Sequence, residues 1–295
     1  GALKVAGADI VTLANNHVLD WGEVGLEETL DTLKAAGIFY AGAGRNEKEA
    51  TRPVVFEVPQ RPARNGNDDV ASAYVKVLAA GFPSAGVPES WRATSKQCGI
   101  NFERVADKDV ANKILSDLRK VLPSPTVPPE SGDDHAISIV SLHWGPNWGW
   151  GTPKEWRKFA HELVDGGVDI VVGHSSHHVK GIEVYKGKMI AYGLGDFLND
   201  YEGIIGQGYE NYRNDLSCLY LPRVNIVSKK VEAIDIIPCK IKHLRVQRTK
   251  NPSDIEWLRS TLSREGKQLG TTCETVVDAS TGHVNLRLHW AQYQS

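Results

Sequence analysis

The sequence predicts an α/β fold, on three observations. Short hydrophobic runs typical of strands alternate along the chain with segments of helical periodicity, which is the element order of α/β proteins. Several expected strands end in polar loops that contain histidine, and α/β proteins build their sites at the carboxyl ends of strands. The 295-residue length, with 41% hydrophobic and 24% charged residues, is enough to bury a large core.

The chain opens with an expected strand–loop–helix–strand unit. A β-rich run at residues 8–13 predicts a buried strand that ends at a polar loop. Residues 23–36 carry apolar side chains at helical spacing, and Gly37 follows as a typical C-terminal cap. A second short strand is expected at residues 38–41.

The same alternation continues through the rest of the chain. Further strands are expected at residues 52–58, 74–80, 136–142, 168–172 and 284–289, hairpins at residues 181–192 and 216–238, and helices at residues 107–121, 153–165 and 252–266. The first hairpin is expected to turn at Lys186 and Gly187. Loops or irregular linkers are expected at residues 61–69, 81–99 and 123–134, which are rich in Gly, Pro and polar residues.

Composition excludes several classes of function. A formal net charge of -2 argues against a nucleic-acid partner. No stretch approaches the run of about 18 apolar residues that a membrane span needs, so no membrane segment is expected. The four cysteines make no CxxC pair and predict neither a disulfide framework nor a zinc knot. No signal peptide is visible, and the localisation, cell envelope or cytoplasm, stays open.

Histidines gather in three of the expected strand-end loops. These loops are LANNH at residues 13–17, SLHWG at residues 141–145 and VVGHSSHH at residues 171–178. Imidazole is the commonest metal ligand in proteins, and a neighbouring Asn oxygen suits Mn, Fe or Zn. One histidine at a strand end is more often structural, but three such loops in one chain predict a metal or catalytic centre.

Tryptophans cluster just after the second histidine loop. The cluster consists of Trp144, Trp148, Trp150 and Trp156. It has two interpretations, which are plain packing and a stacking wall over a sugar or planar substrate. In the second interpretation, Trp144, Asn147 and Trp148 are candidate substrate-binding residues.

Three long segments carry a family resemblance. They are ANNHVLDWGEVGLEETLDTLKAAGI at residues 14–38, LHWGPNWGW at residues 142–150 and GHSSHHVKGIEVYKGKMIAYGLGDFLNDYEGI at residues 173–204. They resemble the bacterial capsule synthesis family CapA of poly-γ-glutamate biosynthesis, a branch of the calcineurin-like metallophosphatase superfamily. The resemblance implies one domain over residues 1–295, a four-layer αββα sandwich, with residues 205–295 as its C-terminal strand–helix–strand portion.

The resemblance also implies a site for two divalent transition metal ions, Mn, Fe or Zn. By this resemblance, the metal ligands include Asn16, His143 and His174. A later histidine completes the set, but GHSSHH is longer than the GHxH element of the superfamily, so this ligand is His178 or His177. We favour His178, because a strand is expected to begin directly after it.

Two further residues have implied catalytic roles. By the resemblance, His17 stands off the metals as general acid and anion stabiliser. Asp20 either orients the other ring nitrogen of His17 or caps the helix that follows. Asp196 is interpreted as a structural turn residue rather than a site residue. Only fifteen residues precede Asn16, and none matches the metal-bridging Asp of the superfamily. We therefore expect an N-terminal part of the domain to be missing and the metal site to be incomplete.

These implications define competing functions. The first is a metal-dependent hydrolase of phosphatase-like chemistry, acting in capsule or poly-γ-glutamate biosynthesis. The second is a non-catalytic polymer-binding or assembly component of the capsule machinery on the same fold. A sugar-binding module that uses the tryptophan loop is a weaker third. The expected partners are an anionic polymer or a phosphoester, and a capsule-synthesis complex.

Overall fold

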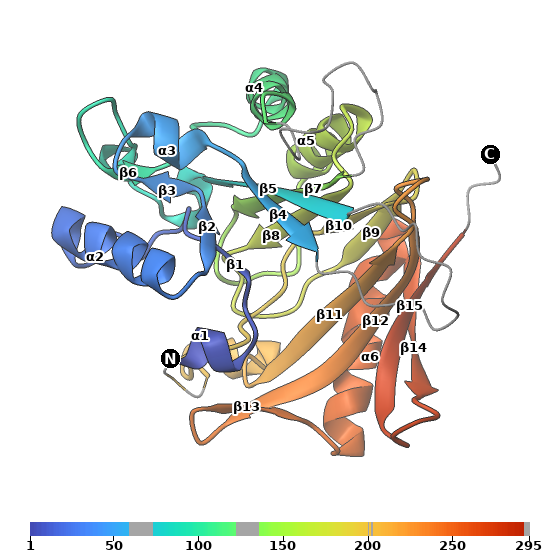
Figure 1. The fold of residues 1–295 in the computed structure, drawn as a ribbon. Helices are drawn as coiled ribbons and strands as arrows, with labels where there is room; N and C mark the ends of the chain where they lie inside the picture. Colours follow the sequence, from blue (N-terminus) through green and yellow to red (C-terminus); the bar gives the residue numbers. More distant parts are fainter. Residues whose placement is uncertain (59–72, 122–135, 200, 202, 292–295) are drawn as a thin grey trace, which may run out of the picture. The chain divides into compact units, whose positions relative to one another are not determined.

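Helices and strands alternate along the chain, as expected for a mixed α/β fold (Figure 1). The computed structural model describes residues 1–58, 73–121, 136–199, 201 and 203–291. The chain divides into two compact units. The first unit comprises Gly1–Trp144 and His161–Ile170, and the second comprises Gly145–Ala160 and Val171–Ser295.

The first unit contains three groups of paired strands. Its elements are helices α1 (Ala2–Val5), α2 (Gly22–Ala35), α3 (Glu47–Thr51) and α4 (Lys108–Arg119), and strands β1 (Ile10–Thr12), β2 (Phe39–Ala41), β3 (Ala43–Gly44), β4 (Val54–Val58), β5 (Ala73–Gly81), β6 (Gly99–Ile100) and β7 (Ala136–His143). β1 and β2 pair in parallel, and β3 pairs antiparallel with β6. β5 pairs antiparallel with β4 and in parallel with β7, with Gly81 opposite His143.

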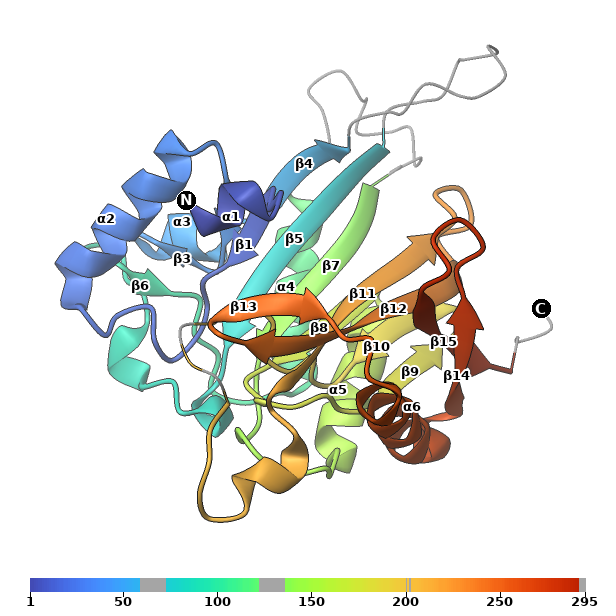
Figure 2. The ribbon, with the colours of Figure 1, turned by 90° about the horizontal axis from the view of Figure 1, so that it is seen from below.

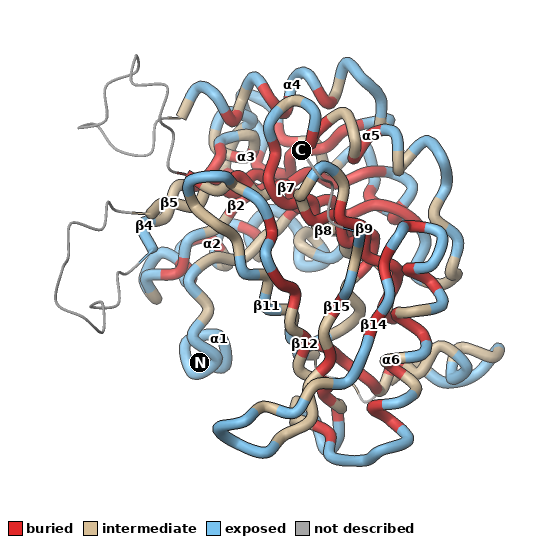
Figure 3. The backbone as a smooth tube through the Cα atoms, turned by 90° about the vertical axis from the view of Figure 1, so that its right-hand side faces the viewer, coloured by how far each residue is buried: buried red, intermediate tan, exposed pale blue. Residues whose placement is uncertain are grey.

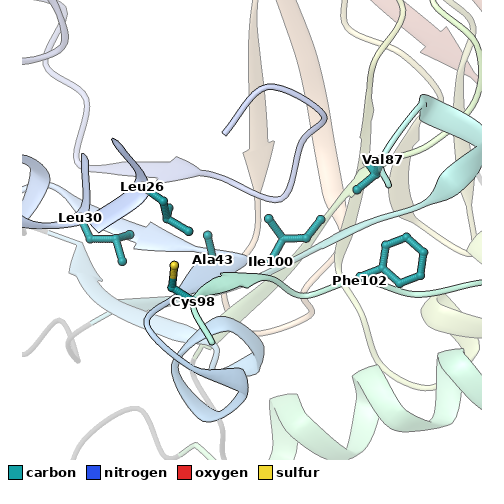
Figure 4. Close-up of a cluster of buried hydrophobic side chains, with 7 residues drawn as sticks. All are labelled: Leu26, Leu30, Ala43, Val87, Cys98, Ile100 and Phe102. Carbon is teal, nitrogen blue, oxygen red and sulfur yellow. The ribbon is translucent and has the colours of Figure 1, made fainter. Parts of the chain in front are cut away.

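Helix α2 buries one apolar face. Leu26 and Leu30 are fully buried and pack with Ala43, Ile100 and other residues of the β3–β6 region (Figure 4). The helix ends where Gly37 adopts a φ of +66°, a left-handed conformation that glycine accepts at low cost. This packing fixes the start of α2, and with it the loop that carries Asn16 and His17.

Close backbone approach also orders this loop. Gly42 has a φ of +91°, and a Cβ there would lie 2.7 Å from the Ala14 side chain and 2.8 Å from that of Ala79. Only glycine fits at such a point. Ala14 of the loop therefore packs directly against strand β5.

The second unit is dominated by a twisted antiparallel sheet. The strands of this unit are β8 (Ile170–His174), β9 (Ile182–Tyr185), β10 (Lys188–Ala191), β11 (Leu216–Val224), β12 (Val231–Lys242), β13 (Arg245–Arg248), β14 (Thr271–Val277) and β15 (Val284–Trp290). Its helices are α5 (Lys154–Asp165) and α6 (Pro252–Gly266). The last residues of α5 belong to the first unit. The large sheet has the order β11-β12-β15-β14, with β13 beside β12 (Figure 2). Along β12, buried positions recur between others that are mostly of intermediate burial (Figure 3).

Most expected elements lie within a few residues of their predicted bounds. Residues 61–69 and 123–134, expected as loops, lie outside the described residues. The strand expected at residues 168–172 is instead β8, which runs on to His174. The strand expected at Val179 is wrong, because Val179 makes only an isolated bridge to Leu194. The single domain over residues 1–295 stays a prediction.

None of the helices in the described parts of the chain is long and apolar enough to cross a membrane.

Candidate functional site

The first unit brings together two of the expected metal ligands. Asn16 Oδ1 lies 3.0 Å from His143 Nε2, although the residues are 127 positions apart in the chain. His143 is the last residue of β7 and is 6% exposed. This separation is that of an ordinary hydrogen bond. The contact therefore brings two candidate ligands side by side.

Beside this pair, His17 is oriented by Asp20. The Asp20 carboxylate lies 2.7 Å from His17 Nδ1. Helix α2 has Trp21 at its N-cap position and no side-chain cap, so the capping interpretation of Asp20 is wrong. A carboxylate on Nδ1 leaves Nε2 directed elsewhere, and the His17 side chain is 73% exposed. Asn15 Oδ1 accepts the backbone N–H of His17 at 2.8 Å.

In the second unit, His178 has the properties of a ligand. It is 0% exposed, and its Nδ1 donates to the carbonyl oxygen of Val179 at 3.0 Å. The proton on Nδ1 leaves a lone pair on Nε2, which has no hydrogen-bond partner within the described residues. Burial lowers the pKa of His178 to about 4, so the ring is neutral at physiological pH. A neutral imidazole with Nδ1 bonded to a carbonyl is the form that binds metals.

His177 is occupied differently. Its Nδ1 lies 3.0 Å from Asp196 Oδ2 and 3.0 Å from the hydroxyl of Tyr201, which donates to the same carboxylate at 2.6 Å. Asp196, interpreted from the sequence as a turn residue, thus pairs with a histidine of the candidate site. Because metal-binding histidines commonly hold Nδ1 against a carboxylate or a carbonyl, hydrogen bonding at Nδ1 does not separate His177 from His178. The preference for His178 stays a prediction, and its full burial is the feature that distinguishes it.

His174 ends strand β8 at a sharp change of backbone direction. The next residue, Ser175, has a φ of +130°, which L-residues rarely adopt. The Ser175 hydroxyl donates to the carbonyl oxygen of Gly145 at 2.8 Å. This strained turn separates His174 from the His177–His178 pair and lengthens the element relative to GHxH.

Aromatic rings enclose His178. Trp150 meets it edge-on at 4.5 Å between ring centroids, and Tyr212 lies 4.6 Å away. Trp148 lies parallel to the His178 ring at 6.1 Å and stacks on Tyr209 at 4.5 Å. These low-polarity surroundings are the cause of the lowered pKa.

The tryptophan cluster is mainly a packing feature in this structure. Trp144 is 2% exposed, which leaves its ring no surface for a substrate, so its expected place in a stacking wall is corrected. Trp148 and Trp150 contact the protein's own aromatic rings. Asn147 is exposed, and its carbonyl accepts the backbone N–H of His177 at 3.0 Å. The sequence interpretation missed Tyr209 and Tyr212, whose only signal is an aromatic pair in a glycine-rich segment.

The donor chemistry suits a divalent transition metal. Asn16, His143 and His178 present one amide oxygen and two imidazole nitrogens, the ligand types that Mn, Fe and Zn accept. No group of three or more His, Cys, Asp and Glu side chains among the described residues is arranged to hold a metal ion. Two observations support metal binding. They are the Asn16–His143 contact in the first unit and the buried Nε2 of His178 in the second.

Similarity to known proteins places the chain in a family. Residues 1–201 match the family described as bacterial capsule synthesis protein PGA_cap. The chain is 38% identical over 283 residues to a probable polyglutamine synthesis accessory protein of Mycobacterium tuberculosis, an alignment that covers 94% of this chain and 67% of that protein. It is 30% identical over 241 residues to the capsule biosynthesis protein CapA of Bacillus anthracis, covering 82% of this chain and 50% of that protein.

A third relative, the PGA biosynthesis protein CapA of Bacillus subtilis, is 27% identical over 236 residues, which cover 79% of this chain and 52% of that protein. The chain belongs to the bacterial capsule synthesis protein family, which confirms the resemblance noted in the sequence. It spans about two thirds of the length of the mycobacterial relative and about half of the length of the Bacillus relatives.

Proposed function

We propose that this protein is a metal-dependent, hydrolase-like member of its family that acts in capsule or poly-γ-glutamate biosynthesis. The observation that carries the proposal is the buried, neutral His178 with its bare Nε2. A buried nitrogen without a partner is costly, and a metal ion is the partner that its tautomer suits. The names of the Bacillus relatives, which refer to capsule and PGA biosynthesis, support the pathway.

The proposed ligands are Asn16 and His143 in the first unit and His174 and His178 in the second, each toward a divalent transition metal such as Mn, Fe or Zn. When bound, such ions activate water and neutralise charge on a phosphoryl group. The domain as a whole would have the four-layer αββα architecture of the metallophosphatases. An anionic polymer or a phosphoester would be the substrate, and a capsule-synthesis complex the setting.

In this proposal His17 supplies the proton for the leaving group. The Asp20 carboxylate on Nδ1 stabilises the imidazolium, and the proton passes from Nε2 to the leaving oxygen. The exposed position of the ring suits this role, because a substrate can reach it. Asp20 is a positioning residue, since it acts through His17.

A second candidate is the non-catalytic one. The mycobacterial relatives are named as accessory proteins of polyglutamine synthesis, which favours an assembly or polymer-binding component on the same fold. Such a protein could bind metal without turnover and would not need His17.

Hydrolysis of a model phosphodiester separates the two candidates. The chain is stripped with EDTA, dialysed, and assayed with bis(p-nitrophenyl) phosphate before and after addition of Mn²⁺ or Zn²⁺. Metal-dependent release of nitrophenol that is retained in a His289→Ala control supports the hydrolase. Binding of metal without any release favours the accessory function.

A further inference from the structure

A cavity of about 510 Å³ opens in the first unit, away from the candidate ligands. The end of α2, the start of β2 and helix α3 form its walls. The residues that matter for its chemistry are Lys34, Phe39, Tyr40, Arg45, Glu49 and Arg52. Its volume lies within the range of about 300–1,000 Å³ that is typical of small-molecule sites.

The cavity and the Asn16–His143 pair lie at opposite ends of the β1–β2 ladder. The two strands are parallel, with Ile10 opposite Phe39 and Thr12 opposite Ala41. Phe39 at the start of β2 lines the cavity, whereas Asn16 follows the far end of β1. A ligand in the cavity would therefore occupy a site distinct from the proposed metal ligands.

Two of the charges in the cavity are compensated within the protein. Glu49 accepts hydrogen bonds from the Tyr40 hydroxyl at 2.6 Å and from the backbone N–H of Arg45 at 2.8 Å. The Arg45 guanidinium donates to Asp31 at 2.6 Å and lies 3.6 Å from Glu49. Burial and the neighbouring Glu49 raise the pKa of Tyr40 to about 12, so the hydroxyl stays a donor. These groups satisfy one another's charges and hydrogen bonds without a ligand.

Lys34 and Arg52 are different. Both are exposed, and neither has an acidic partner among the described residues. They come from different elements, since Lys34 lies in the last turn of α2 and Arg52 caps the end of α3. The cavity thus has two positive charges that no acidic side chain among the described residues pairs with.

The lining of the cavity also includes apolar side chains. Phe39 is 46% exposed, which is high for a phenylalanine, and its ring is braced edge-on by Phe56 at 5.7 Å between centroids. Ile38 and Val54, which also line the cavity, are buried. The cavity therefore suits a ligand that carries both anionic and apolar groups.

We propose that this cavity binds the carboxylates of a γ-glutamyl chain, with Lys34 and Arg52 as the charge partners and Phe39 against the methylene groups. Each γ-linked residue offers one carboxylate and two adjacent methylene carbons, and the cavity lining offers both cationic side chains and an exposed aromatic ring. The choice of polymer rests on the proposed function, whereas the anion-binding character rests on the two cations. The cavity is then a second site that holds the polymer apart from the proposed metal ligands.

Calorimetric titration of EDTA-treated protein with a γ-linked glutamate decamer tests the proposal. Lys34→Gln and Arg52→Gln are each expected to weaken binding about tenfold, as for the loss of one charge-assisted hydrogen bond. The matched control is Lys48→Gln, which removes the same charge from α3 outside the cavity lining and should leave the affinity unchanged. Unfolding midpoints equal to that of the unsubstituted protein confirm that the variants are folded.

Several results would overturn the proposal. They are the absence of decamer binding at millimolar concentration, equal binding by all variants, an equal loss in Lys48→Gln, and inorganic phosphate binding as tightly as the decamer. Because the protein is metal-free in this titration, the outcome is independent of metal content. Failure here leaves the metal-dependent hydrolase standing, and failure of the hydrolase assay leaves the cavity result standing.

Discussion

His17→Ala is expected to slow metal-dependent phosphodiester hydrolysis by about 10²–10⁴-fold, the usual contribution of a general acid. The substitution removes the only proposed proton donor to the leaving oxygen. Since His17 is exposed and outside the proposed ligand set, metal content and unfolding midpoint should not change. Steady-state kinetics with an alkyl phosphodiester, whose leaving alcohol needs a proton, measure the rate, and elemental analysis of the same sample measures the metal content.

The leaving group provides a sharper readout. An ester with a good leaving group needs little protonation, so the deficit of His17→Ala should shrink as the pKa of the leaving alcohol falls. Asp20→Asn should give a smaller loss, because it replaces the carboxylate that orients the His17 ring through Nδ1. An unchanged rate in His17→Ala for every ester would show that the residue is structural.

Asp254→Asn is expected to destabilise the protein by about 3 kcal/mol, the lower end for breaking a buried ion pair. Asp254 is 4% exposed and accepts from Arg213 at 2.7 Å and from Lys240 at 3.3 Å. Loss of its charge leaves these cations with Asp215 alone. Arg213 directly follows the segment Tyr209–Tyr212, so the aromatic surroundings of His178 should loosen as well. Urea unfolding measures the first effect, and tryptophan fluorescence the second.

The effect should depend on pH with a defined sign. Burial alone would raise the pKa of Asp254, but the hydrogen bonds from Arg213 and Lys240 outweigh it and hold the pKa below its usual value. A carboxyl group with a lowered pKa stabilises the fold above its unfolded pKa of about 4, and this contribution is lost as the pH falls through the folded pKa. The difference between Asp254→Asn and the unsubstituted protein should therefore be largest near neutrality and shrink below a pH of about 4.

Asp235→Asn is the matched control for this prediction. Asp235 pairs with Arg287 on the more exposed face of the large sheet, with a side chain that is 26% exposed. Exposed ion pairs contribute about 0–1 kcal/mol, so the control should be nearly neutral. Equal destabilisation by both variants would show that the buried ion-pair network around Asp254 stabilises the protein no more than the more exposed Asp235 pair does.

Regular elements with a strong local signal could be predicted from the sequence. Leu26 and Leu30 recur at helical spacing in α2, and the structure buries both. The hairpin turn at Lys186 and Gly187 is confirmed, because both residues take the positive φ values, +51° and +79°, that a two-residue turn requires. In these cases local sequence and tertiary packing favour the same structure.

Elements with weak local signals were missed. Strand β14 buries Thr271 and Cys273 and exposes Thr272 and Glu274, so its hydrophobic alternation is faint. The short β13 reads as a charged loop, with Arg245 and Arg248 at its ends. Both strands form because β12 and β15 offer them unpaired edges, which is a tertiary effect that no local window contains.

The candidate site was also predictable from the sequence only in part. Histidine-rich strand ends were visible in the sequence, but the 3.0 Å approach of Asn16 and His143 depends on packing between residues 127 positions apart. The burial of His178 and its aromatic surroundings, which include Tyr212, depend on the fold in the same way. Residue types therefore indicated the candidate chemistry, and tertiary contacts determine how each candidate side chain is held.

The metal-to-protein ratio of the unsubstituted chain, His178→Ala and His289→Ala tests the central claim most directly. Each protein is loaded with Mn²⁺ or Zn²⁺, desalted and analysed for metal by mass spectrometry. The account predicts bound metal in the unsubstituted protein and in His289→Ala, and loss of metal from a folded His178→Ala. Full metal content in His178→Ala, or no metal in the unsubstituted protein after loading, would contradict the assignment of His178 as a ligand.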